Sequence, residues 1–134
     1  IAAETAPSGI SSVAVSPDGS RIATFDQDGL VTVSRVAGGD PVRLPELGFW
    51  AHPAGWLADG TLLAHSALAL PAQVMRFDPA TGRVSLFTTL LPGDSAGVER
   101  IHRIRVTPDG ETMVLNYRRM RGALFVLDWK GDPP

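Results

Sequence analysis

The sequence predicts an all-β protein built from a repeated unit of antiparallel strands. The main observation is a hairpin motif that occurs three times, at Val15–Ala23, Trp56–Ala64 and Val106–Val114, where an Asp-Gly turn joins two apolar runs. The turn residues Asp18, Asp59 and Asp109 are 41 and then 50 residues apart, an interval close to that of repeats with four strands. No segment shows a convincing apolar period of about 3.6 residues, which an amphipathic helix would require.

The first two units each contain four apolar or alternating runs that are typical of strands. In the first unit the expected strands are Ser12–Ser16, Arg21–Phe25, Val31–Val36 and Val42–Leu44. In the second unit they are Ala54–Leu57, Leu62–Ser66, Gln73–Phe77 and Arg83–Leu86. The intervening segments, such as DQDG and DPATG, are rich in residues that start turns or tolerate positive φ.

The third unit is incomplete, because the sequence predicts only three strands for it: Arg103–Thr107, Thr112–Tyr117 and Leu124–Asp128. Antiparallel units of this kind pack around an axis in a β-propeller, where each blade covers its neighbours. We therefore expect one domain, 1–134, that is a partial β-propeller. Its blades would be about 10–47, about 52–90 and about 101–134, the last without its outer strand. Four valine and isoleucine residues of the innermost strands should pack near the axis, with Trp56 taking the corresponding place in the second unit: Val13, Val15, Ile104 and Val106.

Composition limits the classes of function. The 134-residue chain is 44% hydrophobic and 19% charged, which is typical of a globular domain. No apolar stretch approaches the roughly 20 residues that a membrane span needs. The net charge of −2 argues against a nucleic-acid-binding protein. Without cysteine, disulfides, thiol catalysis and thiolate metal sites are excluded.

The motif S/T-P-D-G followed by an apolar strand resembles the repeat of TolB-type and WD-like β-propellers. Ser16–Gly19 and Thr107–Gly110 match it fully, whereas Leu57–Gly60 keeps only Asp-Gly. The segment from Arg105 to Asp132 is similar to the last blade of propeller sensor regions in bacterial serine/threonine kinases of the eukaryotic type. That resemblance implies a non-catalytic, extracytoplasmic sensor, since the kinase motifs themselves are absent from this sequence.

Several motifs suggest catalysis or metal binding, but simpler explanations account for them. GDSAG at Gly93–Gly97 matches the nucleophile elbow of α/β-hydrolases, yet the fold and partners of that site are missing, so we expect a loop between blades. DQDG at Asp26–Gly29 lacks the glutamate of a calcium loop and is expected to be a turn. The histidines have no metal-ligand spacing and are expected at the surface or at strand ends: His52, His65 and His102. The tryptophans should cover the core and blade edges: Trp50, Trp56 and Trp129. No catalytic residue, metal or cofactor is predicted.

The best candidate ligand site is basic. Residues 96–134 carry seven cationic residues against five acids, whereas the rest of the chain is acidic. In a propeller, the loop before an innermost strand and the loop between the second and third strands lie on one face. The site residues are therefore expected on such loops of the third unit: Arg100, His102, Arg118, Arg119 and Arg121. Guanidinium groups at this arginine rim would suit a carboxylate or phosphate.

These features predict a non-catalytic binding or sensing module for a protein, a peptide or a small anionic ligand. The alternatives are a propeller that gates a peptidase or hydrolase domain, and a fragment that assembles into closed rings. A homodimer that completes a six-bladed ring is also expected, with the N-terminal segment Ile1–Gly9 supplying a missing strand to a second copy.

Overall fold

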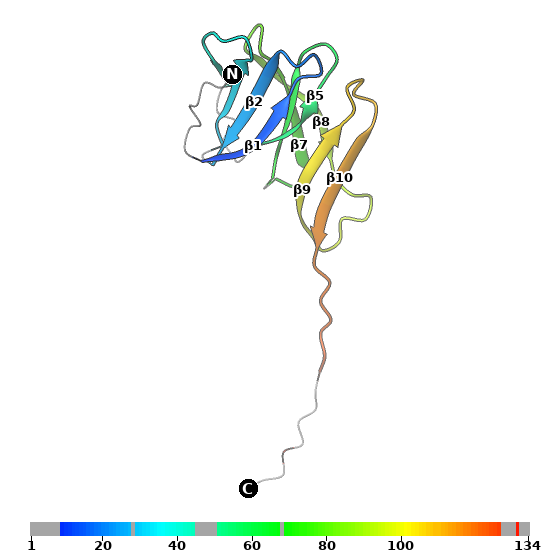
Figure 1. Cartoon of the computed structure of the whole chain (residues 1–134). Helices are drawn as coiled ribbons and strands as arrows, with labels where there is room; N and C mark the ends of the chain where they lie inside the picture. Colours follow the sequence, from blue (N-terminus) through cyan, green and yellow to red (C-terminus); the bar gives the residue numbers. More distant parts are fainter. Residues whose placement is uncertain (1–8, 28, 45–50, 68, 127–130, 132–134) are drawn as a thin grey trace.

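The chain folds into three antiparallel β-sheets that lie side by side in sequence order (Figure 1). The computed structural model describes residues 9–27, 29–44, 51–67, 69–126 and 131. Every regular element in this part of the chain is a strand, which confirms the predicted all-β class. No helix long and apolar enough to cross a membrane occurs among the described residues.

The first two sheets have four strands each, in the order of the sequence. The strands of the first sheet are β1 (Ile10–Val15), β2 (Arg21–Asp26), β3 (Val31–Arg35) and β4 (Val42–Arg43). Those of the second sheet are β5 (Ala51–Trp56), β6 (Leu62–Ser66), β7 (Ala72–Asp78) and β8 (Arg83–Leu90). All eight predicted strands of these two units are present, with ends that differ by a few residues.

The third sheet contains only β9 (Val98–Val106) and β10 (Met113–Arg119) within the described residues. The predicted strand Leu124–Asp128 is wrong for Leu124, Phe125 and Val126, which form no strand and leave the sheets as an extended segment (Figure 1). Its last two residues lie outside the described part of the chain. The physical reason is the long hairpin: β10 pairs with β9 as far as Arg119, and the Met120 N–H then donates to Gly97 O at 2.8 Å, so that the chain is carried past the expected turn.

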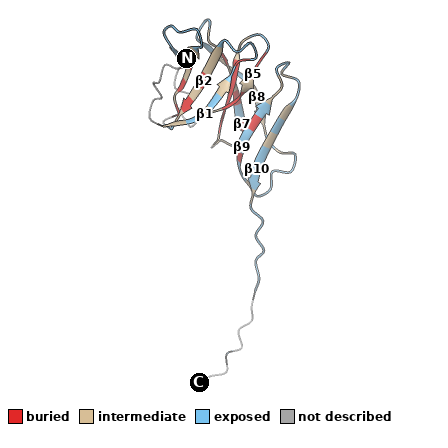
Figure 2. Ribbon diagram, in the orientation of Figure 1, coloured by how far each residue is buried: buried red, intermediate tan, exposed pale blue. Residues whose placement is uncertain are grey.

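The core lies between neighbouring sheets, where Figure 2 shows buried residues. One buried cluster joins the first sheet to the second, with Phe25 and Val33 on one side and Trp56 and Phe77 on the other. A second cluster joins the second sheet to the third through residues such as Leu63 and Ile104. The first strands of the three sheets lie next to one another, since β5 contacts both β1 and β9. The second sheet therefore packs on both of its faces.

The three repeated hairpins share one turn geometry. In the first, the Asp18 carboxylate accepts hydrogen bonds from the Ser16 hydroxyl at 2.6 Å and the Ser20 N–H at 3.0 Å. In the third, Asp109 accepts from the Glu111 N–H at 2.9 Å and from the Thr107 hydroxyl. In the second, Leu57 replaces the hydroxyl residue and is buried in the core instead. The repeated sequence therefore corresponds to a repeated local structure.

Burial corrects part of the expected packing. Ile104 is fully buried and Val106 is partly buried, whereas Val13 and Val15 are 51% and 58% exposed. Side chains alternate between the two faces of a strand. In β1 it is Ala14 that packs against the core between the sheets, so that both valines point to the opposite face. No described sheet covers that face. Trp56 is only 4% exposed, as predicted, whereas Trp50 and Trp129 lie outside the described residues.

Candidate functional site

The residues of the predicted arginine rim lie at the open end of the β9–β10 hairpin, away from its turn. Arg100 and Arg118 are directly opposite each other in the two strands, and Arg119 lies opposite Val98. Arg100, His102, Arg118 and Arg119 are strand residues, so their expected position in loops is wrong. Arg121 follows the end of β10 and is exposed. The strands are longer than the apolar pattern indicated because pairing continues through these charged residues.

Acidic side chains neutralise part of the arginine rim. Arg118 Nε lies 3.0 Å from Glu99 Oε2. Arg119 Nη1 donates to Asp94 Oδ2 at 2.7 Å, and its guanidinium also lies over the Tyr117 ring, 5.5 Å from the ring centre. Arg100 and Arg121 have no ion pair with any described residue. The structure thus brings four of the five predicted residues onto one hairpin but leaves two unpaired guanidinium groups there; ligand binding at this rim stays a prediction.

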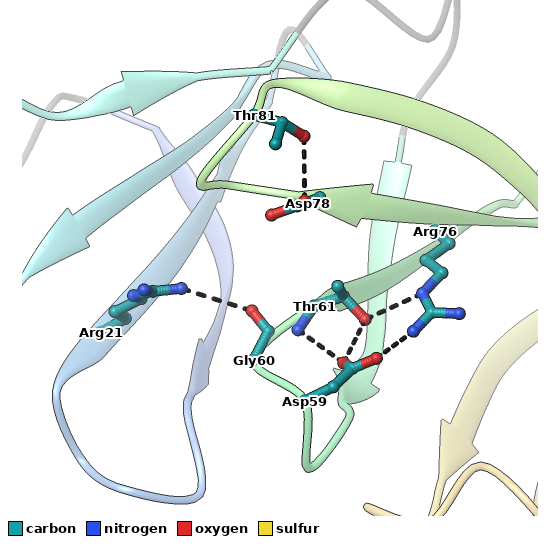
Figure 3. Close-up of polar contacts among 7 residues, drawn as sticks. All are labelled: Arg21, Asp59, Gly60, Thr61, Arg76, Asp78 and Thr81. Carbon is teal, nitrogen blue, oxygen red and sulfur yellow. Dashed lines mark hydrogen bonds and ion pairs between the residues drawn. The ribbon is translucent and has the colours of Figure 1, made fainter.

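A second candidate site is a groove between the first two sheets, at the end where their first turns lie (Figure 3). It consists of adjoining hollows of about 310, 560 and 350 Å³. Ala80 lines all three, Asp59 and Asp78 line the first and second, and Arg21 lines the first and third. We call it the polar groove. Its charged residues are Asp18, Arg21, Arg35, Asp40, Asp59, Arg76, Asp78 and Arg83. Four guanidinium groups and four carboxylates give it a formal charge of zero.

The second sheet supplies a hydrogen-bonded group of three residues to the polar groove. The turn between β5 and β6 holds Asp59, whose Oδ1 accepts hydrogen bonds from the Thr61 N–H at 3.0 Å and the Thr61 hydroxyl at 2.6 Å. Arg76 of β7 forms an ion pair with the other oxygen of Asp59, and its Nε donates to Thr61 Oγ1 at 3.0 Å (Figure 3). These bonds fix Asp59, Thr61 and Arg76 as one unit.

Arg21 and Asp78 make further hydrogen bonds in the polar groove. Arg21, the first residue of β2, reaches across from the first sheet and donates through Nη1 to Gly60 O at 3.4 Å (Figure 3). At the end of β7, the Asp78 carboxylate accepts from the Ala80 N–H at 2.9 Å and from the Thr81 hydroxyl at 2.9 Å. Arg21 also lines one hollow of the groove together with Asp18 and Asp78.

Hydrogen bonds favour the ionised form of three carboxylates of the polar groove, Asp18, Asp59 and Asp78. The hydrogen bond from Ser16, with those from Ser20, lowers the pKa of Asp18 to about 2. The Thr61 hydroxyl and N–H and the Arg76 guanidinium lower the pKa of Asp59, and the bonds from Ala80 and Thr81 lower the pKa of Asp78. A carboxylate with a lowered pKa is a poor general acid near neutral pH. The groove is therefore suited to recognise polar and charged groups.

Sequence reasoning did not find the polar groove, because its residues come from four separate hairpins and carry no net charge. The usable signal was the recurrence of turns that contain an aspartate and a glycine and are followed by an arginine: Asp18 with Arg21, and Asp78 with Arg83. Only the packing of the first sheet on the second brings these pairs to one surface. The sequence prediction was based on an excess of positive residues, and a site with equal numbers of carboxylates and guanidinium groups shows no such excess.

The buried histidine pair is another feature that the sequence did not reveal. His52 of β5 and His65 of β6 are directly paired, with ring centres 5.7 Å apart. His65 is only 1% exposed, so it is not at the surface; of the two expected positions it has the one near a strand end, since β6 ends at Ser66. Burial lowers the pKa of His65 to about 4, and burial together with Arg103 and Arg105 lowers the pKa of His52. Both lowered pKa values favour the neutral ring at physiological pH; His65 packs in the interior and His52 is half-buried beside it.

Two other motifs occur where the sequence placed them. GDSAG lies in the exposed loop between β8 and β9, where Asp94 Oδ1 accepts from the Ala96 N–H at 3.2 Å. Of the DQDG segment, Asp28 lies outside the described residues; Gln27 and Gly29 lie in the turn between β2 and β3, and Asp26 Oδ1 accepts from the Leu30 N–H at 2.8 Å. Among the described residues, no group of three or more histidine, aspartate or glutamate side chains could hold a metal ion.

No protein-family model matches this chain, and no curated protein sequence matches it.

Proposed function

We propose that the chain is a non-catalytic binding or sensing module, and that its three sheets are blades of a β-propeller segment. Three similar hairpins, with their first strands side by side and their cores between the sheets, support the propeller interpretation. The resemblance of the last unit to kinase sensor blades favours a sensing role. Folds of this kind host many functions, so the ligand has to be argued from the site.

The observation that carries the proposal is that four carboxylates and four guanidinium groups together line the polar groove. Asp59 and Arg76 already form an ion pair, but Arg35 and Arg83 have no ion pair with any other described residue. Such a surface offers hydrogen-bond donors and acceptors together. It complements a peptide or protein segment that carries charges of both signs, more closely than a purely anionic ligand.

The test is binding of short peptides to the whole chain, followed by fluorescence anisotropy. We would compare a peptide that alternates lysine and glutamate with peptides of the same length that contain only glutamate or only lysine. The mixed peptide is expected to bind best, and to bind more weakly as salt rises because exposed charges are screened within about 10 Å at 0.1 M salt. Equal binding of the all-glutamate peptide would contradict the mixed-charge proposal.

Two sets of variants locate the site. Arg83→Gln with Asp78→Asn removes one charge of each sign from the polar groove and is expected to abolish binding of the mixed peptide. The triple variant Arg118→Ala, Arg119→Ala and Arg121→Ala changes only the arginine rim and is expected to leave that binding intact. If the rim variant loses binding and the groove variant keeps it, the ligand site is at the rim.

A further inference from the structure

We propose that the segment 122–126 is a donor strand, which pairs with the outer edge of β10 in a second copy of this chain. The proposal is independent of any ligand at the polar groove. Three apolar side chains of this segment are almost fully exposed: Leu124 is 94%, Phe125 is 80% and Val126 is 85% exposed. The segment leads away from the sheets, and its described residues are exposed in Figure 2.

The repeat shows that this segment corresponds to the third strand of the first two sheets. Counted from the glycine of each first turn, β3 begins 12 residues after Gly19 and β7 begins 12 residues after Gly60. The same count from Gly110 reaches Gly122. Two residues further along, Val33 and Val74 are 4% and 0% exposed, whereas the equivalent Leu124 is not buried at all. The segment therefore has the sequence position and the apolar character of a third strand, but it is detached.

The edge that should receive a third strand is vacant. In the first two sheets, the second strand has partners on both sides, whereas β10 pairs only with β9 within the described residues. The register of the first sheet, with Ala23 opposite Val33 and Ile22 opposite Ser34, predicts Leu124 opposite Val114 and Phe125 opposite Met113. Val114 is 68% exposed, and Met113 borders the buried cluster between the second and third sheets. A donor strand in this register would cover both.

The connection before the segment explains why the strand goes to another copy. Four residues link β2 to β3, and five link β6 to β7. Only Met120 and Arg121 stand between β10 and Gly122, and Met120 is still bonded to Gly97. A two-residue hairpin turn needs positive φ, which glycine, asparagine and aspartate supply and which methionine and arginine resist. A connection that is too short for a strand to return to its own sheet favours strand exchange between copies. In a two-fold dimer, each copy would pair its segment with the free edge of β10 in the other.

A cysteine pair tests the exchange directly, because the chain has no cysteine of its own. Val114→Cys with Leu124→Cys would place two thiols opposite each other, at a separation that a disulfide can span. After mild oxidation, we expect a covalent dimer of twice 14.2 kDa on a non-reducing gel. A disulfide-bonded monomer would show that the strand returns to its own sheet, and unreacted thiols would show that it pairs with neither; both results overturn the proposal. Val13→Cys with Leu124→Cys is the matched control and should not cross-link.

A second pair of substitutions keeps the test independent of the cysteines. Met120→Asn with Arg121→Gly supplies a favourable two-residue turn. Light scattering at micromolar concentration should show a dimer for the unmodified chain and a monomer for this hinge variant. In combination with the cysteine pair, the hinge substitutions should convert the intermolecular disulfide into an intramolecular one. A monomeric unmodified chain with the same circular dichroism as the hinge variant would contradict the exchange.

Discussion

His65 Nε2 accepts a hydrogen bond from the backbone N–H of Ile104 at 3.3 Å, and this bond joins β6 of the second sheet to β9 of the third. The other ring nitrogen, Nδ1, lies 3.3 Å from Ser66 O, where it donates a hydrogen bond. Both contacts are satisfied only by the neutral ring, because a protonated ring would place an N–H against the N–H of Ile104. The junction between two sheets thus depends on the protonation state of one buried side chain.

We predict that stability falls between pH 6.5 and pH 4.5 because of His65. Its pKa is about 4 in the folded protein against 6.5 in the unfolded chain, so the unfolded state binds more protons in this range. Stability therefore rises with pH through this interval and is lost as pH falls. The expected loss is on the order of 2 kcal/mol. Urea unfolding at the two pH values, followed by circular dichroism, measures it.

The control for this prediction is a comparison of two variants. His65→Gln removes the titrating group, so the variant should be less stable at pH 7 but should depend less on pH in the same interval. His102→Gln changes an exposed histidine and should retain the full dependence of the unmodified chain. An equal pH dependence for the unmodified chain and His65→Gln would assign the effect to other groups.

Gly55 of β5 is predicted to be the most sensitive glycine between the second and third sheets. Its φ is +149°, and an added Cβ would lie 2.9 Å from Val106 Cγ1 and 3.2 Å from Val106 O. Gly55→Ala should therefore push β9 away and destabilise the fold by about 2 to 3 kcal/mol. Gly38→Ala is the matched control, because Gly38 also has positive φ, +94°, but open space around it. Its cost should be about 1 kcal/mol, from the backbone alone.

Trp56 should contribute a specific bond between the first and second sheets. Its Nε1 donates to Ala14 O at 3.1 Å, and the ring is buried in the cluster between the two sheets. Trp56→Phe removes the donor and part of the ring, with an expected loss of about 2 kcal/mol in urea unfolding. A loss within about 0.5 kcal/mol, the range of ordinary surface substitutions, would mean that the bond does not stabilise the fold.

The pKa of Asp18 should depend on the hydrogen bonds in the turn between β1 and β2. The Ser16 hydroxyl bond is the largest contribution that lowers its pKa to about 2, from 3.8. We expect Ser16→Ala to raise the pKa of Asp18, as measured by carboxyl-carbon NMR. Because the folded pKa is the lower one, the stabilising contribution of Asp18 is present above pH 3.8 and is lost as pH falls toward 2.

The hairpins could be predicted from the sequence because their determinants are local. Asp-Gly turns and alternating apolar residues fix β1 with β2 and β5 with β6 with little help from the rest of the chain. The face that each strand buries could not be predicted in the same way. In β1, Val13 and Val15 are more apolar than Ala14, yet Ala14 packs on the second sheet because Trp56 fills the adjacent space.

The third unit shows the other limit of sequence reasoning. Leu124–Val126 has the pattern of a strand, but pattern alone does not say which edge a strand will join. In the proposed strand exchange, that choice depends on the two-residue connection Met120–Arg121 and on the hydrogen bond from Met120 to Gly97. The polar groove was missed for a related reason, since Arg21 and Asp59 become neighbours only when two sheets pack.

The two-sided packing of the second sheet makes the molecule a row in which every sheet is stabilised by its nearest neighbours. Amide protons of β6 should therefore exchange only through global unfolding. Those of β10, at one end of the row, should exchange through local fraying. A partner that packs on the third sheet would add one more stabilising interface at that end of the row. Hydrogen-exchange protection would then rise in the last hairpin first, and the row would begin to unfold from its other end.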